Sequence, residues 1–131
     1  MSENIMKVWG ERRRILLTDY SEIDLLYLNK NSFCSTHRHK DKINGFVVIS
    51  GKVIIETQYG STTLLKNESF SVYPKTIHRF ISLENSIMIE LAYTKKGKIN
   101  ENDIERISQG GTIVNNKEIT LDEMEKKVID K

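Results

Sequence analysis

The sequence predicts an all-β domain with a short C-terminal helix, and two observations carry that prediction. Apolar, β-branched runs recur about every ten residues across residues 24–94, with turn-forming residues between them. The length of 131 residues suits one domain that can bury a substantial core. Strands at this spacing, without helical patterns between them, indicate a β-sandwich or barrel rather than alternating β-α units.

The expected strands follow in order along the chain. Residues 24–33 are apolar and end in a turn where Asn31 is expected to take a positive φ. Residues 45–60 are expected to form a hairpin, because Ser50-Gly51 separates two β-branched runs. Two further pairs of short strands are expected in residues 61–74, around Lys66-Asn67, and in residues 77–94, around Glu84-Asn85.

The C-terminal tail has a different pattern. We expect a β-barrel domain over residues 1–109 and a tail over residues 110–131, with Gly110-Gly111 as the joint. Thr120 followed three residues later by Glu123 matches a capping box, which predicts a helix over about 121–130.

Composition and charge exclude several classes of protein. Lys plus Arg number 20 and Asp plus Glu number 18, a balance that argues against nucleic-acid binding. The basic tract Arg12–Arg14 is isolated, without interleaved aromatic residues, and favours a solvated strand edge or a partner contact. Cys34 is the only cysteine, which precludes an intrachain disulfide. No run approaches the roughly 18 apolar residues of a membrane span, and no signal-peptide pattern opens the chain, so a cytoplasmic protein is expected.

The three histidines suit one metal site. His37 and His39 lie two residues apart, so in an extended strand their side chains share one face. His78 follows a Pro74 turn and precedes an apolar run, so a neighbouring strand could bring it to the same point. Three neutral imidazoles suit one divalent ion such as Zn, Mn, Ni or Fe and leave positions open for a ligand. A polar loop around His37 and His39 is the alternative.

These residues resemble a known family. His37-x-His39, then Asn44, then Gly51 resembles the first cupin motif, and residues 73–78 loosely resemble the second. Trp9-Gly10 and residues 97–107 are similar to the cupin domain of type II mannose-6-phosphate isomerases. The resemblance covers about residues 8–107 and implies a cupin-type jelly-roll β-barrel with Asn44 near a fourth metal position.

Two departures from the family pattern bear on activity. A metal-binding carboxylate is expected where Asn44 stands, and a neutral amide oxygen binds more weakly. The chain after Arg106 continues as Ile-Ser-Gln-Gly-Gly, without the further arginines of the isomerases. If those arginines hold a sugar phosphate, such a ligand here would depend on Arg79, Arg106 or a lysine.

Other polar residues are candidates for the site. Glu90 interrupts an apolar strand and is the candidate general base, with a solvent-facing position as the alternative. Tyr73, Lys75, Arg79 and Arg106 are candidates for ligand binding. Arg79 directly follows His78, so in a regular strand its side chain points to the opposite face.

The resemblance and the histidines leave three functions open. The first is a metal-dependent enzyme, such as an isomerase, acting on a sugar or sugar phosphate. The second is a non-catalytic cupin that binds a small molecule, and the third is a metal-dependent oxygenase. We also expect a homodimer, because small barrels of this kind leave sheet edges that a second copy can cover.

Overall fold

The computed structural model describes residues 3–129, with side chains described for residues 4–125. The elements of this part of the chain are β1 (Glu3–Lys7), β2 (Gly10–Leu17), β3 (Ser21–Leu28), β4 (Ser32–Phe33), β5 (Thr36–Arg38), β6 (Lys42–Ser50), β7 (Val53–Thr57), β8 (Gly60–Leu64), β9 (Ser69–Val72), β10 (His78–Ser82), β11 (Ser86–Thr94), β12 (Glu105–Ser108), β13 (Gly111–Val114), β14 (Lys117–Thr120) and α1 (Leu121–Ile129). The predicted all-β class with one short C-terminal helix is confirmed.

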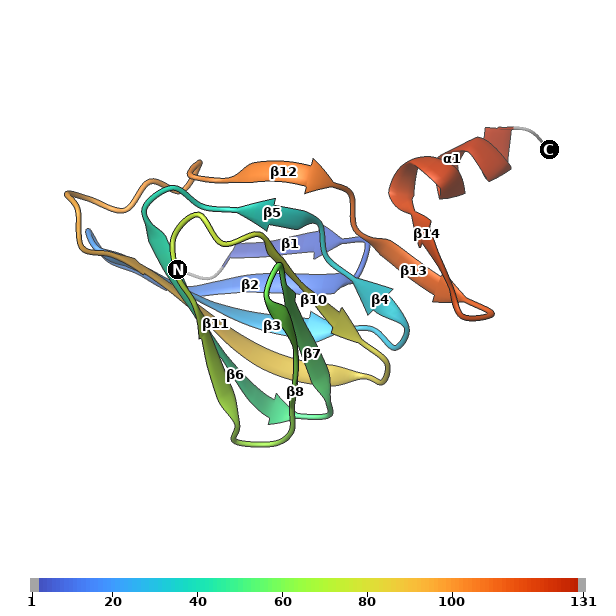
Figure 1. Ribbon diagram of the computed structural model, residues 1–131, viewed down its shortest axis with the longest axis horizontal. Coiled ribbons are helices and arrows are strands. Elements are labelled where there is room, and N and C mark those ends of the chain that lie inside the picture. Colours follow the sequence, from blue (N-terminus) through green and yellow to red (C-terminus); the bar gives the residue numbers. More distant parts are fainter. Residues whose placement is uncertain (1–2, 130–131) are drawn as a thin grey trace.

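The strands form two antiparallel sheets. The first sheet has the order β1-β2-β3-β11-β6-β9. The second has the order β12-β5-β10-β4-β13-β14, with β7 paired to β10 and β8 paired to β7. The sheets lie over one another as a jelly-roll sandwich, and β13, β14 and α1 project from one end (Figure 1). Within the described residues no ladder joins the two sheets into a closed barrel.

The predicted hairpin at Ser50-Gly51 is wrong. Strand β6 pairs with β11 and β9 in the first sheet, whereas β7 pairs with β10 and β8 in the second. Gly51 has a φ of 88°, and a Cβ atom there would lie 2.3 Å from the Ser86 hydroxyl oxygen. The Ser-Gly turn therefore carries the chain from one sheet to the other. Strand β6 pairs with β11, which is distant in sequence, whereas β7 forms a local hairpin with the next strand, β8, and also pairs with β10. A local pattern does not reveal the distant partner of β6.

The predicted local features at the chain's turns and tail are present. Asn31 has a φ of 59°. The Glu123 carboxylate accepts hydrogen bonds from the backbone N–H and the hydroxyl of Thr120, at 3.3 and 3.0 Å. Helix α1 ends at Ile129, and residue 130 of the predicted helix lies outside the described residues. The tail begins as β13, which pairs with β4, so it extends the second sheet. The predicted domain boundary at residue 109 stays a prediction.

The inward positions of β3 change from polar to apolar along the strand. In β3 the buried positions are Glu22, Asp24, Leu26 and Leu28, at the period of two that an extended strand dictates. The leucines join a core with Trp9, whose ring meets that of Phe80 edge-on at 5.1 Å. Because the acidic residues occupy the same face beyond this core, the space between the sheets becomes polar at that end.

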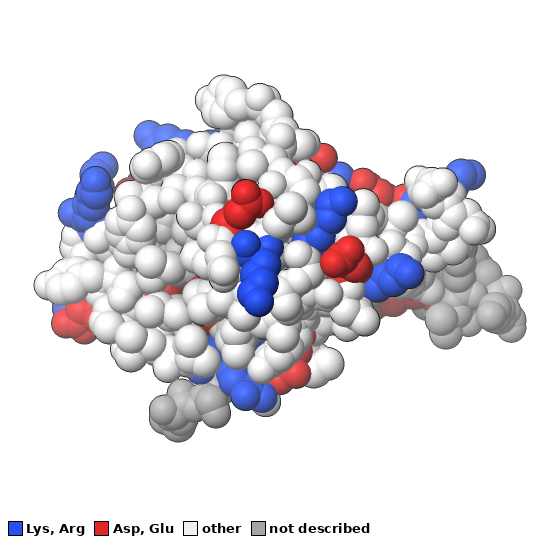
Figure 2. Space-filling view, turned by 90° about the horizontal axis from the view of Figure 1, so that it is seen from below, with Lys and Arg blue, Asp and Glu red and all other residues white. Residues whose placement is uncertain are grey.

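The face in Figure 2 carries basic and acidic residues scattered among uncharged ones, without a field of one sign. Among the described residues there is no helix long and apolar enough to cross a membrane.

Candidate metal centre

The second sheet brings the three histidines together. His37 lies in β5 and is paired in register with His78, the first residue of β10, while His39 follows β5 directly. One ring nitrogen from each residue can be chosen so that all three lie within 4.8 Å of one another. All three side chains are buried. This cluster could hold one metal ion, as the spacing of the histidines predicts.

Backbone carbonyls fix the orientation of the three imidazole rings. The Nδ1 atoms of His37, His39 and His78 lie 2.8, 2.6 and 2.8 Å from carbonyl oxygens. The respective acceptors are Ser35, Asp103 and Thr76. Because a carbonyl only accepts, each Nδ1 carries the hydrogen, and each Nε2 keeps the lone pair that a metal needs.

The unprotonated nitrogens have the properties of metal ligands. The Nε2 atoms of His39 and His78 are buried and have no hydrogen-bond partner among the described residues. Burial lowers the pKa of His37 to about 3 and that of His78 to about 4, and it also lowers the pKa of His39. The imidazoles are therefore neutral at pH 7, the form that binds a metal. Buried ring nitrogens that lack a hydrogen-bond partner are expected where a metal ion is their partner.

Asn44 and Glu90 face the histidines from the first sheet. The Asn44 side-chain N–H donates to a Glu90 carboxylate oxygen at 2.7 Å, and the Asn44 carbonyl oxygen is buried without a partner. That oxygen is available as a further ligand. Burial and the nearby charge of Asp24 raise the pKa of Glu90 to about 7. Glu90 lines the cavity, so the solvent-facing alternative is wrong, and its carboxyl group can both accept and donate a proton near neutral pH.

One cavity of about 140 Å³ between the sheets contains these groups. It is lined by the three histidines, Asn44 and Glu90, and of the four predicted ligand-binding residues it includes only Arg106. Tyr73 is 62% exposed and does not line it. Lys75 lines a separate hollow beside His39.

Arg79 lies on the opposite face of β10, as its position after His78 predicts. Its guanidinium binds Glu56 at 2.9 Å and both carboxylate oxygens of Glu118 at 2.8 and 2.7 Å. It also lies 5.2 Å from the centre of the Phe33 ring. The structure therefore places Arg79 in a link between β10, β7 and β14 and away from the cavity.

A buried ionic network beside the cavity was not found from the sequence. The Arg14 guanidinium binds Asp24, Glu22 at 2.8 Å and Glu101 at 2.9 Å. The Lys42 ammonium lies 2.8 Å from the other oxygen of Glu22. The available signal was the alternation in β3, which places Glu22 and Asp24 on the same face as the apolar Leu26 and Leu28.

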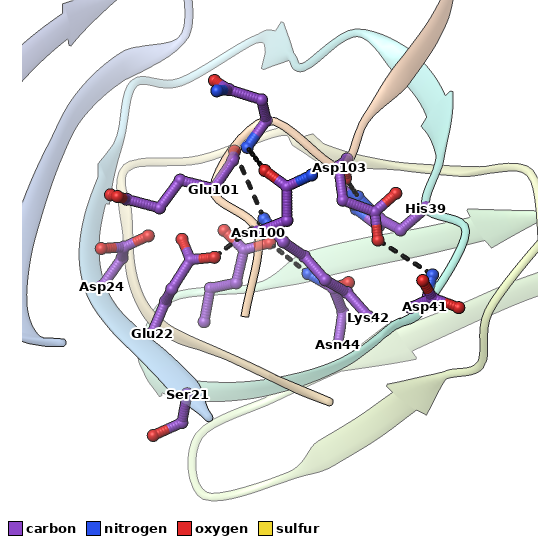
Figure 3. A network of polar contacts seen from close by, with 12 residues as sticks. Ser21, Glu22, Asp24, His39, Asp41, Lys42, Asn44, Asn100, Glu101 and Asp103 are labelled. Carbon is purple, nitrogen blue, oxygen red and sulfur yellow. Dashed lines mark hydrogen bonds and ion pairs between the residues drawn. The ribbon is translucent and has the colours of Figure 1, made fainter. Parts of the chain in front are cut away.

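The segment of residues 95–104, here called the strap, runs beside the cavity, which Glu101 and Ile104 help to line. Figure 3 shows Glu101 and Asp103 of the strap next to Lys42 and His39. The Asp103 carboxylate accepts hydrogen bonds from the backbone N–H groups of Lys40 and Asp41, at 2.7 and 2.9 Å. The Asp103 carbonyl holds His39, and Glu101 holds Arg14. Burial opposes the charge of Asp103, but these hydrogen bonds outweigh it and lower the pKa of Asp103. The strap thus connects the ionic network to one metal-site histidine.

Comparison with known proteins identifies the family. The sequence model described as mannose-6-phosphate isomerase C-terminal matches residues 1–109. The chain belongs to this family. The resemblance to the cupin domain of mannose-6-phosphate isomerases, inferred from the motifs, is thereby confirmed. A search of curated proteins with this sequence gives no match.

Solved structures agree on the fold of this family member. KdgF from Halomonas sp. superposes with a TM-score of 0.61 at 18% identity, over 66% of this chain and 79% of that chain. Oxalate decarboxylase from Bacillus subtilis gives a TM-score of 0.70 at 14% identity, over 81% of this chain but only 30% of that chain. The cupin domain of Schizosaccharomyces pombe Cnp3 gives 0.62 at 11% identity, over 65% and 64%. The predicted cupin-type jelly roll is confirmed.

Proposed function

We propose that this cupin binds one divalent metal ion through His37, His39 and His78 and holds a sugar or sugar phosphate beside it. The observation that carries the proposal is the convergence of three oriented, neutral imidazoles in a cavity that also holds Glu90. The Asn44 carbonyl oxygen supplies a neutral fourth ligand. Zn, Mn, Ni and Fe all suit this donor set. The family's name supports a sugar-phosphate ligand.

A bound ion would polarise a carbonyl or hydroxyl oxygen of the ligand. The residues of the chain supply the remaining chemistry. Glu90, with a pKa of about 7, accepts a proton from the carbon beside a carbonyl or returns it, which is the proton transfer that aldose–ketose isomerisation requires. The Asn44 N–H orients the Glu90 carboxylate. The two sheets and the strap limit the access of water.

Binding without efficient turnover is the second candidate, and Asn44 is the observation that favours it. A full isomerase site is expected to have a charged metal ligand at this position and a group of arginines after Arg106. Losing one transition-state hydrogen-bond donor costs about 10²–10³ in rate. We therefore expect weak or absent mannose-6-phosphate isomerase turnover.

Metal content tests the first part of the proposal. Protein purified without chelator and supplied with Zn, Mn, Ni or Fe is expected to hold about one ion per chain. His39→Ala should abolish stoichiometric binding, whereas Lys66→Ala, in an exposed turn, should leave it unchanged. Mass spectrometry of the washed protein gives the ratio. A wild-type protein that retains none of the four metals would contradict the proposed centre.

A second experiment separates enzyme from binding module. Metal-loaded protein is titrated with mannose and mannose 6-phosphate by calorimetry, and turnover is followed in a coupled assay. Turnover that Glu90→Gln removes supports the isomerase, and saturable binding without turnover supports the binding module. If no common sugar or sugar phosphate binds, the carbohydrate assignment is wrong, and the oxygenase alternative is tested with iron and oxygen. The cytoplasmic location and the homodimer also stay predictions.

A further inference from the structure

Besides Lys42, which is paired with Glu22, three basic side chains line the same cavity as the histidines. They are Lys7 at the end of β1, Arg12 in β2 and Arg106 in β12. Arg12 is opposite the buried Leu26 in the β2–β3 ladder, and Arg106 is opposite His37 in the β5–β12 ladder. Residues directly opposite one another in an antiparallel pair project on the same side. The sheet registers therefore direct Arg12 and Arg106 inward from opposite sheets.

These three cations have no ion-pair partner among residues 4–125. Lys7, Arg12 and Arg106 form no ion pair within 4.0 Å and no side-chain hydrogen bond among residues 4–125, and the Nε atom of Arg12 is buried without a partner. A buried guanidinium nitrogen without an acceptor is costly unless a ligand supplies one.

The acidic residues around the cavity are already engaged. Glu22 is paired with both Arg14 and Lys42, and Asp24 and Glu101 are bound by Arg14. Glu90 remains, and its carboxylate accepts a hydrogen bond from the Asn44 amide. Lys7, Arg12 and Arg106 are therefore left without a paired acid among residues 4–125.

The three cations are also close enough to repel one another. Burial lowers the pKa of Lys7, and the positive charges of Arg12 and Arg106 lower it further, while Glu90 opposes the shift. Like charges gathered in a partly buried cavity cost free energy, and an anion in the same space would recover it.

We propose that Lys7, Arg12 and Arg106 form an anion subsite for the compact oxyanion group of a small molecule, a phosphomonoester or a carboxylate. Guanidinium groups present paired N–H donors that match such oxyanions, and lysine adds a point charge. Because the cations and the histidines line one cavity of about 140 Å³, the ligand is a small anion. The sugar part of this ligand rests on the proposed function; the anion subsite does not.

Inorganic phosphate tests the subsite without depending on the metal or on a sugar. Calorimetric titration of metal-free protein should show phosphate binding that Arg12→Ala and Arg106→Ala each weaken about tenfold or more, the loss expected for a hydrogen bond to a charged group. Arg13→Ala is the matched control, because Arg13 bonds Asn4 at 3.0 Å and lies over the Tyr27 ring, outside the cavity. Melting temperatures verify that each variant is folded, and Arg106 lies on an exposed edge strand that tolerates substitution.

The possible outcomes decide the matter. Loss in the Arg12 and Arg106 variants, with Arg13→Ala unchanged, supports the subsite. Equal phosphate affinity in all variants, or no binding to the wild type at tens of millimolar phosphate, overturns it. Metal-loaded protein is then titrated with mannose, mannose 6-phosphate and glucuronate. A preference for either anionic sugar that Arg12→Ala removes supports the subsite and identifies the phosphate or carboxylate source. Failure of all three sugars, with phosphate binding intact, rejects the sugar proposal and keeps the subsite.

Discussion

Replacing Arg14 with methionine is expected to destabilise the fold by about 3–5 kcal/mol, the cost of removing one partner of a buried ion pair. Arg14 is 7% exposed, and its guanidinium binds the buried carboxylates of Glu22 and Asp24. Methionine keeps most of the aliphatic volume but leaves Asp24 without a cation. Glu22 retains Lys42 at 2.8 Å. The exposed Glu101 contributes at most about 1 kcal/mol to the loss.

Urea denaturation measures this free energy, and fluorescence of Trp9, the only tryptophan, follows it in the core. Arg13→Met, one residue away on the outward face, should cost no more than about 0.5 kcal/mol. The double variant Arg14→Met/Asp24→Leu should be more stable than Arg14→Met alone, because it removes the uncompensated charge and keeps the Glu22–Lys42 pair. A cost below about 1 kcal/mol for Arg14→Met, or a double variant no more stable than the single one, would refute the reasoning.

Three other predictions address the metal, acid stability and assembly. Asn44→Glu should destabilise the metal-free protein by about 1–3 kcal/mol, because Glu90 loses a hydrogen-bond donor and gains a like charge beside it. Calorimetry should show that adding Zn raises the melting temperature of this variant more than that of the wild type. An equal rise would exclude residue 44 as a ligand. Hydrogen bonding and charge from Arg79 lower the pKa of Glu118. The Arg79–Glu118 pair therefore stabilises the fold above the unfolded pKa of about 4.3, and this stabilisation is lost as the pH falls through the lower folded pKa. Glu118→Gln should therefore cost up to about 1 kcal/mol in urea at pH 7 and progressively less below pH 4, and a pH-independent difference would argue against the pair. Light scattering at tens of micromolar should give a dimer that Leu16→Glu, at the exposed end of β2, weakens, whereas a wild-type monomer would contradict the predicted homodimer.

The strands and the histidine cluster could be predicted because both depend on patterns within a few residues. The spacing of His37 and His39 puts both rings on one face, and the same alternation correctly turns Arg79 away from His78. The pairing of the strands could not be predicted in this way. Ser50-Gly51 has the composition of a hairpin turn, yet it connects the two sheets, because the partner of β6 is β11, about forty residues further along the chain.

The basic part of the cavity was missed for a related reason. In sequence, the run Arg12–Arg14 has the composition of a solvated edge, and only the register with β3 shows that Arg12 and Arg14 face inward while Arg13 faces outward. Glu90 was found because a single acid interrupts an apolar strand. Asp24 begins an apolar run, so nothing in its immediate neighbours separates it from an ordinary surface residue.

The carbonyls that hold the histidines differ in their distance along the chain. His37 and His78 each bond a carbonyl two residues earlier, so these two rings can be set as soon as their own turns form. His39 bonds the carbonyl of Asp103, 64 residues away, so the orientation of its ring depends on the position of the strap. The orientation of His37 and His78 thus depends on local contacts, and that of His39 depends on a contact between residues distant in sequence. Metal exchange at the proposed centre should therefore depend on the contacts that hold the strap in place, as well as on the three metal–nitrogen bonds.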